Sequence, residues 1–187
     1  MRASDKAKLI LHAAQRGWIA RPPNLPRRLR PWLCDRGSLT RRLKARCAHF
    51  QVQPTSVGLA RAQIDETRLL NIAPAQRAYV RDVRLLCDGQ AVVFAHSVLT
   101  RPHLRSAWKS LTSLGNRPLG EALFSNPRIQ REPLRFRKLT QRHPLFQHIA
   151  RDHALTGHTL WARRSVFRLA GRPLLVTEVF LPAIVSL

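Results

Sequence analysis

The sequence predicts an α+β protein whose core is a six-stranded, largely antiparallel sheet with helical segments between the strands. The first observation is a pair of hairpin signals, in which strand-like segments flank a short turn that contains glycine. They cover residues 78–87 and 91–99 around Asp88-Gly89-Gln90, and residues 159–169 and 173–181 around Ala170-Gly171-Arg172. The second observation is that helix-like segments separate these hairpins. Hairpins with helices between them are typical of the α+β class.

Residues 1–30 are expected to form a basic extension, extended or disordered, ahead of a single domain at residues 31–187. Residues 5–15 fit a short helix. The segment at residues 21–31 follows, and its prolines and arginines are too frequent for regular secondary structure. The total length of 187 residues suits one domain with a short appendage.

The first helix of the domain is predicted to begin after Ser38 and to reach about residue 46. Serine is a favoured N-cap because its hydroxyl accepts a hydrogen bond from a backbone N–H of the first turn. The other N–H groups of that turn would be available to an anion. Residues 51–62 form the first predicted strand, and Pro54 predicts an edge position because proline cannot donate to a sheet ladder.

The segments between the two hairpins are predicted to contain three helices and one strand. Apolar periodicity, glycine and proline set their limits. They are a helix at 105–114 ending at Gly115, a short helix that begins within 117–120 and runs to Phe124, a strand at 128–139, and a helix at 143–153.

The formal net charge is +23, with 28 arginines and five lysines, and residues 1–46 carry +11 of it. Such a charge would suit a nucleic-acid-binding protein. However, the basic residues are scattered, only 6% of residues are aromatic, and no helix-turn-helix or zinc-finger motif occurs. We therefore expect no specific nucleic-acid partner. Attachment of the basic extension to an anionic membrane is a further alternative, and no apolar run approaches the roughly 20 residues of a membrane span.

The cysteines and histidines predict neither a disulfide framework nor a metal site. Cys34, Cys47 and Cys87 are odd in number and lack the spacing of a zinc or redox motif, which favours a reducing, cytoplasmic location. The eight histidines include no HExxH motif, and the last four are five residues apart, so they would not share a helical face. We expect no cofactor and no metal.

Two charges stand in otherwise apolar rows of the predicted strands. Side chains alternate between the faces of a strand, and Arg81 is the only charge in the row 79, 81, 83, 85, 87. Glu178 is likewise the only charge in the row 174, 176, 178, 180. A buried, unpaired charge is costly, so each needs a partner. Either Arg81 and Glu178 form structural ion pairs, with each other or with separate partners, or they mark opposite ends of a ligand pocket.

Residues 161–182 closely resemble the C-terminal end of the chorismate pyruvate-lyase family, because Trp-x-Arg-Arg-Ser, Gly-x-Pro-Leu-Leu, Thr-Glu and Phe-Leu-Pro stand in the family's order. Upstream, Arg81 followed by residues 85–89 resembles the family's arginine-bearing strand and hairpin. Residues 114–120 resemble its Leu-Gly-x-x-Pro-Leu-Gly segment. The resemblance covers about residues 31–183.

The resemblance implies a lyase that converts chorismate to 4-hydroxybenzoate and pyruvate, the first committed step of ubiquinone biosynthesis, with inhibition by its product. It also implies a six-stranded antiparallel sheet with helical flaps over a buried site, here at residues 37–46 and 105–124.

By the same resemblance, Arg81 would bind the ring carboxylate, and the backbone N–H groups of Leu39 and Leu119 would complete that anion site. Leu39 stands where the best-known members carry Met. Glu178 would bind the opposite end, where the enolpyruvyl ether breaks, and would assist by hydrogen bonding or by proton transfer at the ether oxygen.

The main alternative is a sensor that binds a small aromatic acid without catalysis. The same fold serves as the ligand-binding half of some bacterial transcription regulators, which carry a winged helix of about 60–70 residues upstream. Only about 30 residues precede the resemblance here, so we expect the enzyme, acting as a monomer on chorismate.

Overall fold

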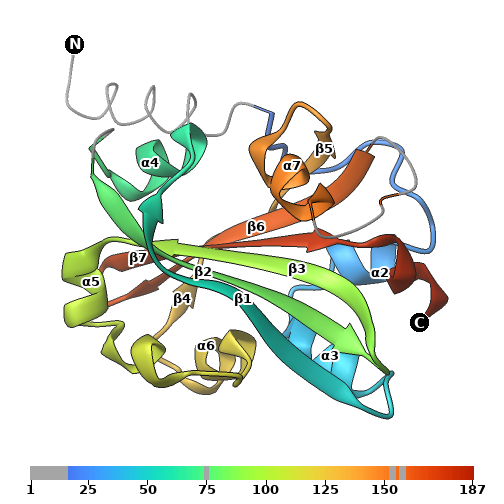
Figure 1. The fold of residues 1–187 in the computed structure, drawn as a ribbon, viewed down its shortest axis with the longest axis horizontal. Coiled ribbons are helices and arrows are strands. Elements are labelled where there is room, and N and C mark those ends of the chain that lie inside the picture. Colours follow the sequence, from blue (N-terminus) through green and yellow to red (C-terminus); the bar gives the residue numbers. More distant parts are fainter. Residues whose placement is uncertain (1–16, 74–75, 152–154, 156–158) are drawn as a thin grey trace.

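The computed structural model describes residues 17–73, 76–151, 155 and 159–187, and this part of the chain forms one antiparallel sheet of seven strands flanked by short helices (Figure 1). The strands are β1 (Phe50–Arg61), β2 (Arg77–Cys87), β3 (Gln90–Leu99), β4 (Gln130–Arg131), β5 (Arg135–Thr140), β6 (Thr159–Leu169) and β7 (Arg172–Phe180). Their order in the sheet is β1-β2-β3-β7-β6-β4, and β5 also pairs with β6.

The predicted α+β class and both predicted hairpins are confirmed. The turns lie where the sequence places them, with Asp88 and Ala170 at φ of 50° and 49° and a glycine after each, also at positive φ. The predicted number of six strands is wrong, because the sheet has seven. The strand predicted at residues 128–139 is divided into β4 and β5. Pro133 lies in the break, where a residue without an N–H cannot continue the ladder.

The edge position predicted from Pro54 is also confirmed. β1 ends the strand order and pairs only with β2 on this path. The register of that ladder shifts between Pro54 and Ser56. The missing N–H of Pro54 is therefore accommodated at a sheet edge, at an irregularity of the ladder.

The helices of the described residues are all short. They are α2 (Arg30–Leu33), α3 (Leu39–Lys44), α4 (Ile64–Leu70), α5 (Arg101–Arg105), α6 (Leu119–Ser125) and α7 (Pro144–Ala150), with 3-10 helices η1 (Lys109–Ser113) and η2 (Pro182–Ser186). The N-cap predicted at Ser38 is confirmed, since its hydroxyl accepts a hydrogen bond from the Arg41 N–H at 3.3 Å.

The helix predicted at residues 105–114 is wrong. α5 begins earlier, after Thr100, whose hydroxyl accepts from the His103 N–H, and Pro102 lies in its first turn. Ser106 then leaves the helical region with φ −114° and ψ −105°. The following residues form η1, which the sequence periodicity does not distinguish from a continuous helix.

Helices cover both faces of the sheet. In the view of Figure 1, α3 and α6 lie below the strands and α4 and α7 lie above them, whereas α5 lies at the left end of the strands. Leu43 of α3 packs in one buried cluster with Val83, and Leu70 of α4 packs in another with Val80. The alternation of side chains along β2 therefore supplies two separate cores, one on each face.

Residues 1–16, including the helix predicted at 5–15, lie outside the described residues. Within the rest of the predicted extension, Trp18 and Leu25 are buried and belong to the clusters on the sheet. Ile19 forms an antiparallel bridge with Phe136 of β5. The described part of the extension thus packs on the domain.

The expectation of no disulfide framework is contradicted at one pair of cysteines. Cys47 and Cys87 are joined, with their Cα atoms 5.3 Å apart, and Cys34 is the free, exposed cysteine. The register explains this pair, because Phe50 of β1 lies opposite Cys87 of β2 and the chain just before Phe50 runs past the same strand end. Across the described ranges, no helix has both the length and the apolar character needed to cross a bilayer.

Candidate functional site

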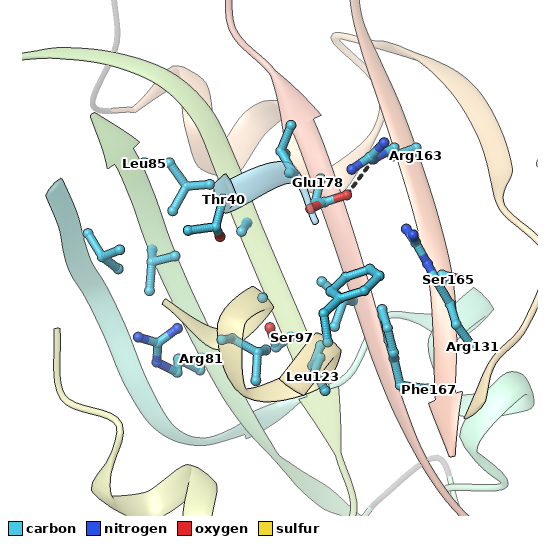
Figure 2. Close-up of a pocket in the computed structure, with 18 residues that line it drawn as sticks. Thr40, Arg81, Leu85, Ser97, Leu123, Arg131, Arg163, Ser165, Phe167 and Glu178 are labelled. Carbon is cyan, nitrogen blue, oxygen red and sulfur yellow. Dashed lines mark hydrogen bonds and ion pairs between the residues drawn. The ribbon is translucent and has the colours of Figure 1, made fainter. Parts of the chain in front are cut away.

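A cavity lies between the sheet and the two helices α3 and α6 (Figure 2). Each of the four central strands contributes alternate residues to its lining, which is expected of side chains that share one sheet face. These are Arg81, Val83 and Leu85 of β2, Ala95 and Ser97 of β3, Val176 and Glu178 of β7, and Arg163, Ser165 and Phe167 of β6. The cavity is therefore apolar along much of its wall and charged at particular points.

Arg81 lies in this cavity with 4% of its surface exposed. Its Nη2 donates to the carbonyl oxygens of Gly115 at 2.9 Å and Arg117 at 3.2 Å, both in the segment that leads into α6. Burial lowers the pKa of the Arg81 guanidinium. These contacts hold one nitrogen of the guanidinium in place and leave its other N–H groups able to bind a ligand anion.

Leu39 and Leu119 are the first residues of α3 and α6, and both line the same cavity. Because the first N–H groups of a helix have no partner within it, these two amides are donors that the helices themselves do not use. The helices approach each other closely, since a Cβ built on Gly120 would lie 2.8 Å from Oγ1 of Thr40. Two helix N-termini thus converge over the sheet beside Arg81.

Glu178 lies opposite Arg163 in the ladder between β7 and β6, and Nε of Arg163 donates to Oε2 of Glu178 at 2.5 Å. Arg163 is completely buried. Its Nη1 also donates to three carbonyl oxygens at the end of α2 and just beyond it, those of Trp32, Leu33 and Asp35. Arg163 therefore binds Glu178 and the end of α2 together.

The structure agrees in part with each interpretation of the isolated charges, because Glu178 has a separate ion-pair partner and both charges line one cavity. Arg81 and Glu178 do not pair with each other, since Arg81 binds carbonyl oxygens and Glu178 binds Arg163. Both nevertheless line the same cavity. The four residues selected from the sequence, Leu39, Arg81, Leu119 and Glu178, are thus brought together.

Sequence reasoning missed two further arginines of the cavity, Arg163 and Arg131. Arg163 stands in the row 161, 163, 165, 167 of β6 among apolar or small residues, so the argument used for Arg81 applies to it equally. Arg131 gives no such signal, because β4 is only two residues long.

Arg131 is held by a hydrogen bond from Nη1 to the carbonyl oxygen of Arg36 at 2.8 Å. Its Cζ lies 5.3 Å from the ring centroid of Phe124 and 5.2 Å from that of Phe167. Burial lowers the pKa of Arg131 to about 10, although the nearby Glu178 acts in the opposite direction. Arg131 lines both the cavity and an open groove on its other side, where Arg21, Arg30 and Arg135 also lie.

A separate polar cluster lies on the opposite face of the sheet, where Glu66, Asp82 and His96 are buried and His148 is partly exposed. His96 contacts Asp82 through Nδ1 at 2.5 Å and Glu66 through Nε2 at 3.0 Å, and His148 lies 3.3 Å from the other Asp82 oxygen. Burial acts to lower the pKa of His96, but the two carboxylates outweigh it and raise that pKa to about 10. None of these residues lines the cavity, so the cluster belongs to the core beneath α4 and α7.

Among the described residues, no group of three or more histidine, cysteine or acidic side chains is arranged to hold a metal ion. The chemistry offered by the cavity comes from its guanidinium groups, the carboxylate of Glu178 and the two helix N-termini. Such a set can bind an anion at more than one point and can hydrogen-bond a hydroxyl or ether oxygen.

Comparison with known proteins gives close matches over nearly the whole chain. A family model described as Chorismate lyase matches residues 11–186. A protein of Thiobacillus denitrificans named probable chorismate pyruvate-lyase is 51% identical over 172 residues, covering 92% of each chain. A protein of the same name from Nitrosomonas europaea is 50% identical over 167 residues, covering 89% of this chain and 94% of the relative.

Solved structures of transcription regulators share the fold at low sequence identity. The C-terminal domain of PhnF gives a TM-score of 0.54 at 12% identity, covering 73% of this chain and 86% of that domain. The C-terminal domain of the histidine utilization repressor from Pseudomonas syringae gives a TM-score of 0.52 at 11% identity, covering 72% of this chain and 93% of that domain. At these identities the likeness concerns the fold alone.

Proposed function

The chain belongs to the chorismate lyase family and is a lyase enzyme, and on that premise we propose that it converts chorismate to 4-hydroxybenzoate and pyruvate in the cavity described above. The observation that carries this proposal is that Arg81 and Glu178 line one cavity, with two helix N-termini converging beside Arg81. A cyclic acid with a carboxylate at one end of the ring and oxygen substituents at the other matches this distribution of charge.

In the proposed reaction the ether bond between the ring and the enolpyruvyl oxygen breaks, and the neighbouring ring carbon, which bears the hydroxyl group, loses its hydrogen as a proton. The ring becomes aromatic, the hydroxyl stays on it, and the ether oxygen leaves with the three-carbon fragment that becomes pyruvate. No nucleophile is consumed. The protein has to hold the substrate and to stabilise the charge that develops on the departing oxygen.

Arg81 and the N–H groups of Leu39 and Leu119 would bind the ring carboxylate in this proposal. A guanidinium with two backbone donors is a typical carboxylate site, because all three contribute hydrogen bonds and the guanidinium contributes its charge. The carbonyl contacts of Arg81 to Gly115 and Arg117 support the proposal, since they couple the arginine to the segment that begins α6.

Glu178 would act at the opposite end of the ring, by hydrogen bonding to the reacting oxygen substituents or by proton transfer at the ether oxygen. The bond from Nε of Arg163 to Oε2 supports a fixed orientation for this carboxylate. It leaves Oε1 as the oxygen that can face the substrate.

The direct test is incubation of the purified protein with chorismate. The two products should appear in equal amounts, 4-hydroxybenzoate by liquid chromatography and pyruvate by coupled reduction with lactate dehydrogenase. Tight binding of an aromatic acid with no pyruvate formed would instead support a sensor. The regulator-like solved structures do not favour that alternative, because they share only 11–12% identity with this chain.

The pathway and cellular setting are part of the proposal. Ubiquinone synthesis would use the 4-hydroxybenzoate, so deletion of the gene should lower ubiquinone and added 4-hydroxybenzoate should restore it. A cytoplasmic location, a monomeric state and inhibition by 4-hydroxybenzoate are proposed as well. Cell fractionation, sedimentation and initial rates with added product test them in turn.

A further inference from the structure

Chorismate carries two carboxylates, one on the ring and one on the enolpyruvyl arm, and Arg81 with the N–H groups of Leu39 and Leu119 would bind the first. The second must also leave water when the substrate enters the cavity. A buried carboxylate without a partner is costly, so the site requires a second cationic group at the end that receives the arm. The inference below rests on the proposed function.

The charges that line the cavity match a dianion. Its described lining contains three guanidinium groups, those of Arg81, Arg131 and Arg163, and one carboxylate, that of Glu178. Arg163 is paired with Glu178, which leaves Arg81 and Arg131 as the two cations without a carboxylate partner in the described lining. Arg81 is the group proposed to bind the ring carboxylate.

Arg131 presents the edge of its guanidinium that suits a carboxylate. Its Nη1 is occupied by the carbonyl oxygen of Arg36, whereas its Nε is buried and has no hydrogen-bond partner among the described residues. Nε and Nη2 lie on the same edge of a guanidinium and can donate two parallel hydrogen bonds to one carboxylate. Phe124 and Phe167 flank the group and restrict its movement.

A second unsatisfied donor lies at the same end of the cavity. Nη2 of the completely buried Arg163 also lacks a hydrogen-bond partner among the described residues. Figure 2 shows the side chain of Arg163 beside that of Glu178, with the Arg131 side chain on the same wall of the cavity. The pKa of Arg131 is shifted by both Glu178 and Arg163, which is consistent with this proximity.

We propose that Arg131, with Nη2 of Arg163 beside it, binds the carboxylate of the enolpyruvyl arm of chorismate. The arm is then held at its far end while Arg81 holds the ring, and the ether bond between the two lies beside Glu178. Arg131 is a binding residue that positions the bond to be broken. The product 4-hydroxybenzoate has no enolpyruvyl arm and would therefore make no contact with Arg131.

Substitution of Arg131 tests the binding of the arm carboxylate separately from that of the ring carboxylate. Arg131→Gln should lower kcat/KM for chorismate on the order of 100-fold, as expected for loss of a bidentate, charge-assisted contact. It should change the Kd for 4-hydroxybenzoate, measured by calorimetry, by less than about threefold. Arg131→Lys keeps the charge without the paired donors and should fall between wild type and Arg131→Gln.

Arg128→Gln is the matched control, because Arg128 is an exposed residue near Arg131 that does not line the cavity. It removes the same charge and should leave both measurements unchanged. The proposal is overturned if Arg131→Gln leaves kcat/KM for chorismate unchanged. It is also overturned if the substitution weakens the binding of 4-hydroxybenzoate as much as that of chorismate. If Arg131→Gln fails to fold by thermal denaturation, Arg131→Lys supplies the same comparison.

Failure of the proposed function would be visible separately. If wild-type protein forms no pyruvate, the lyase assignment fails, and equilibrium binding still tests the subsite. In that case wild type should bind chorismate more tightly than Arg131→Gln does, with 4-hydroxybenzoate affinity unaffected. Equal chorismate affinity in the two proteins would remove the subsite as well.

Discussion

Arg163 and Glu178 face each other across the β6–β7 ladder, with Nε and Oε2 2.5 Å apart. The arginine is completely buried and also binds three carbonyl oxygens at the end of α2. Arg163 therefore positions the carboxylate that is proposed to act on the substrate, and the carbonyl oxygens near the end of α2 hold Arg163 itself in place. A change at either residue should affect the site and the fold together.

Glu178→Gln should lower kcat by at least about 100-fold if Glu178 transfers a proton, since general acid–base groups typically contribute factors of 10²–10⁴. The variant should also unfold at a lower temperature, because Arg163 loses its counter-charge while it stays buried. Single-turnover rates and thermal denaturation measure the two effects. Near-full turnover by Glu178→Gln would eliminate proton transfer and leave only a hydrogen-bonding role.

Arg81→Ala should weaken binding of 4-hydroxybenzoate by about 2–5 kcal/mol, the usual range for truncating one partner of a buried, hydrogen-bonded charge pair. Arg81→Lys is the companion variant, because it retains the charge but not the bidentate geometry. Calorimetric titration with 4-hydroxybenzoate gives both affinities. Unchanged affinity in Arg81→Ala would show that the ring carboxylate is bound elsewhere.

Gly120→Ala should separate α6 from α3, since the added Cβ would lie 2.8 Å from Oγ1 of Thr40. The two N-termini beside Arg81 would then be misplaced, and kcat/KM for chorismate should fall about tenfold or more, as small displacements of positioning groups typically do. The double variant Thr40→Ala/Gly120→Ala removes the clashing oxygen and should recover part of the loss. No recovery would place the effect outside this contact.

His96 should make the protein less stable as pH rises above neutrality. Its pKa is raised from 6.5 to about 10 in the folded state by Glu66 and Asp82, with His148 also facing Asp82. The stabilisation is complete below pH 6.5 and is lost as the pH rises to about 10, because only the folded state keeps the proton in that interval. The slope is at most about 1.4 kcal/mol per pH unit.

Urea denaturation of wild type and His96→Gln at several pH values between 6 and 10 checks this sign. The difference in unfolding free energy between the two proteins should shrink as the pH rises. Glu66→Gln serves as a second variant that removes one partner of the same histidine. A difference that stays constant with pH would mean that His96 is neutral in the folded protein.

Much of the sheet could be predicted because its signals are local. The turns at Asp88-Gly89 and Ala170-Gly171 and the N-cap at Ser38 each depend on a few adjacent residues. The error at residues 105–114 also concerns a local signal, because the N-cap at Thr100 and Pro102 in the first turn of α5 are a stronger start signal than any at residue 105. The disulfide depends on the β1–β2 register, which the cysteine spacing does not reveal.

Without the family resemblance, which supplied Leu39 and Leu119, the sequence pattern marks the candidate site only where one charge interrupts an apolar row. Arg81 and Glu178 satisfied that condition, and Arg163 satisfied it too but lay next to Arg164. Neighbours on a strand point to opposite faces, and Arg164 binds Asp65 on the far side of the sheet. The pair therefore looks like an exposed basic patch when it is two buried residues with different partners. Arg131 became visible only once the strands were placed in space.

Arg131 belongs both to the cavity and to the open groove beside it, and this position has a kinetic consequence. In the proposed binding mode, a pyruvate held by Arg131 would adjoin the groove, whereas 4-hydroxybenzoate would be held by Arg81 beneath the two helices. The products would then dissociate in a fixed order, with pyruvate first. In an ordered Uni Bi scheme, 4-hydroxybenzoate competes with chorismate for the free enzyme, and pyruvate inhibits noncompetitively by rebinding to the enzyme that still holds the ring.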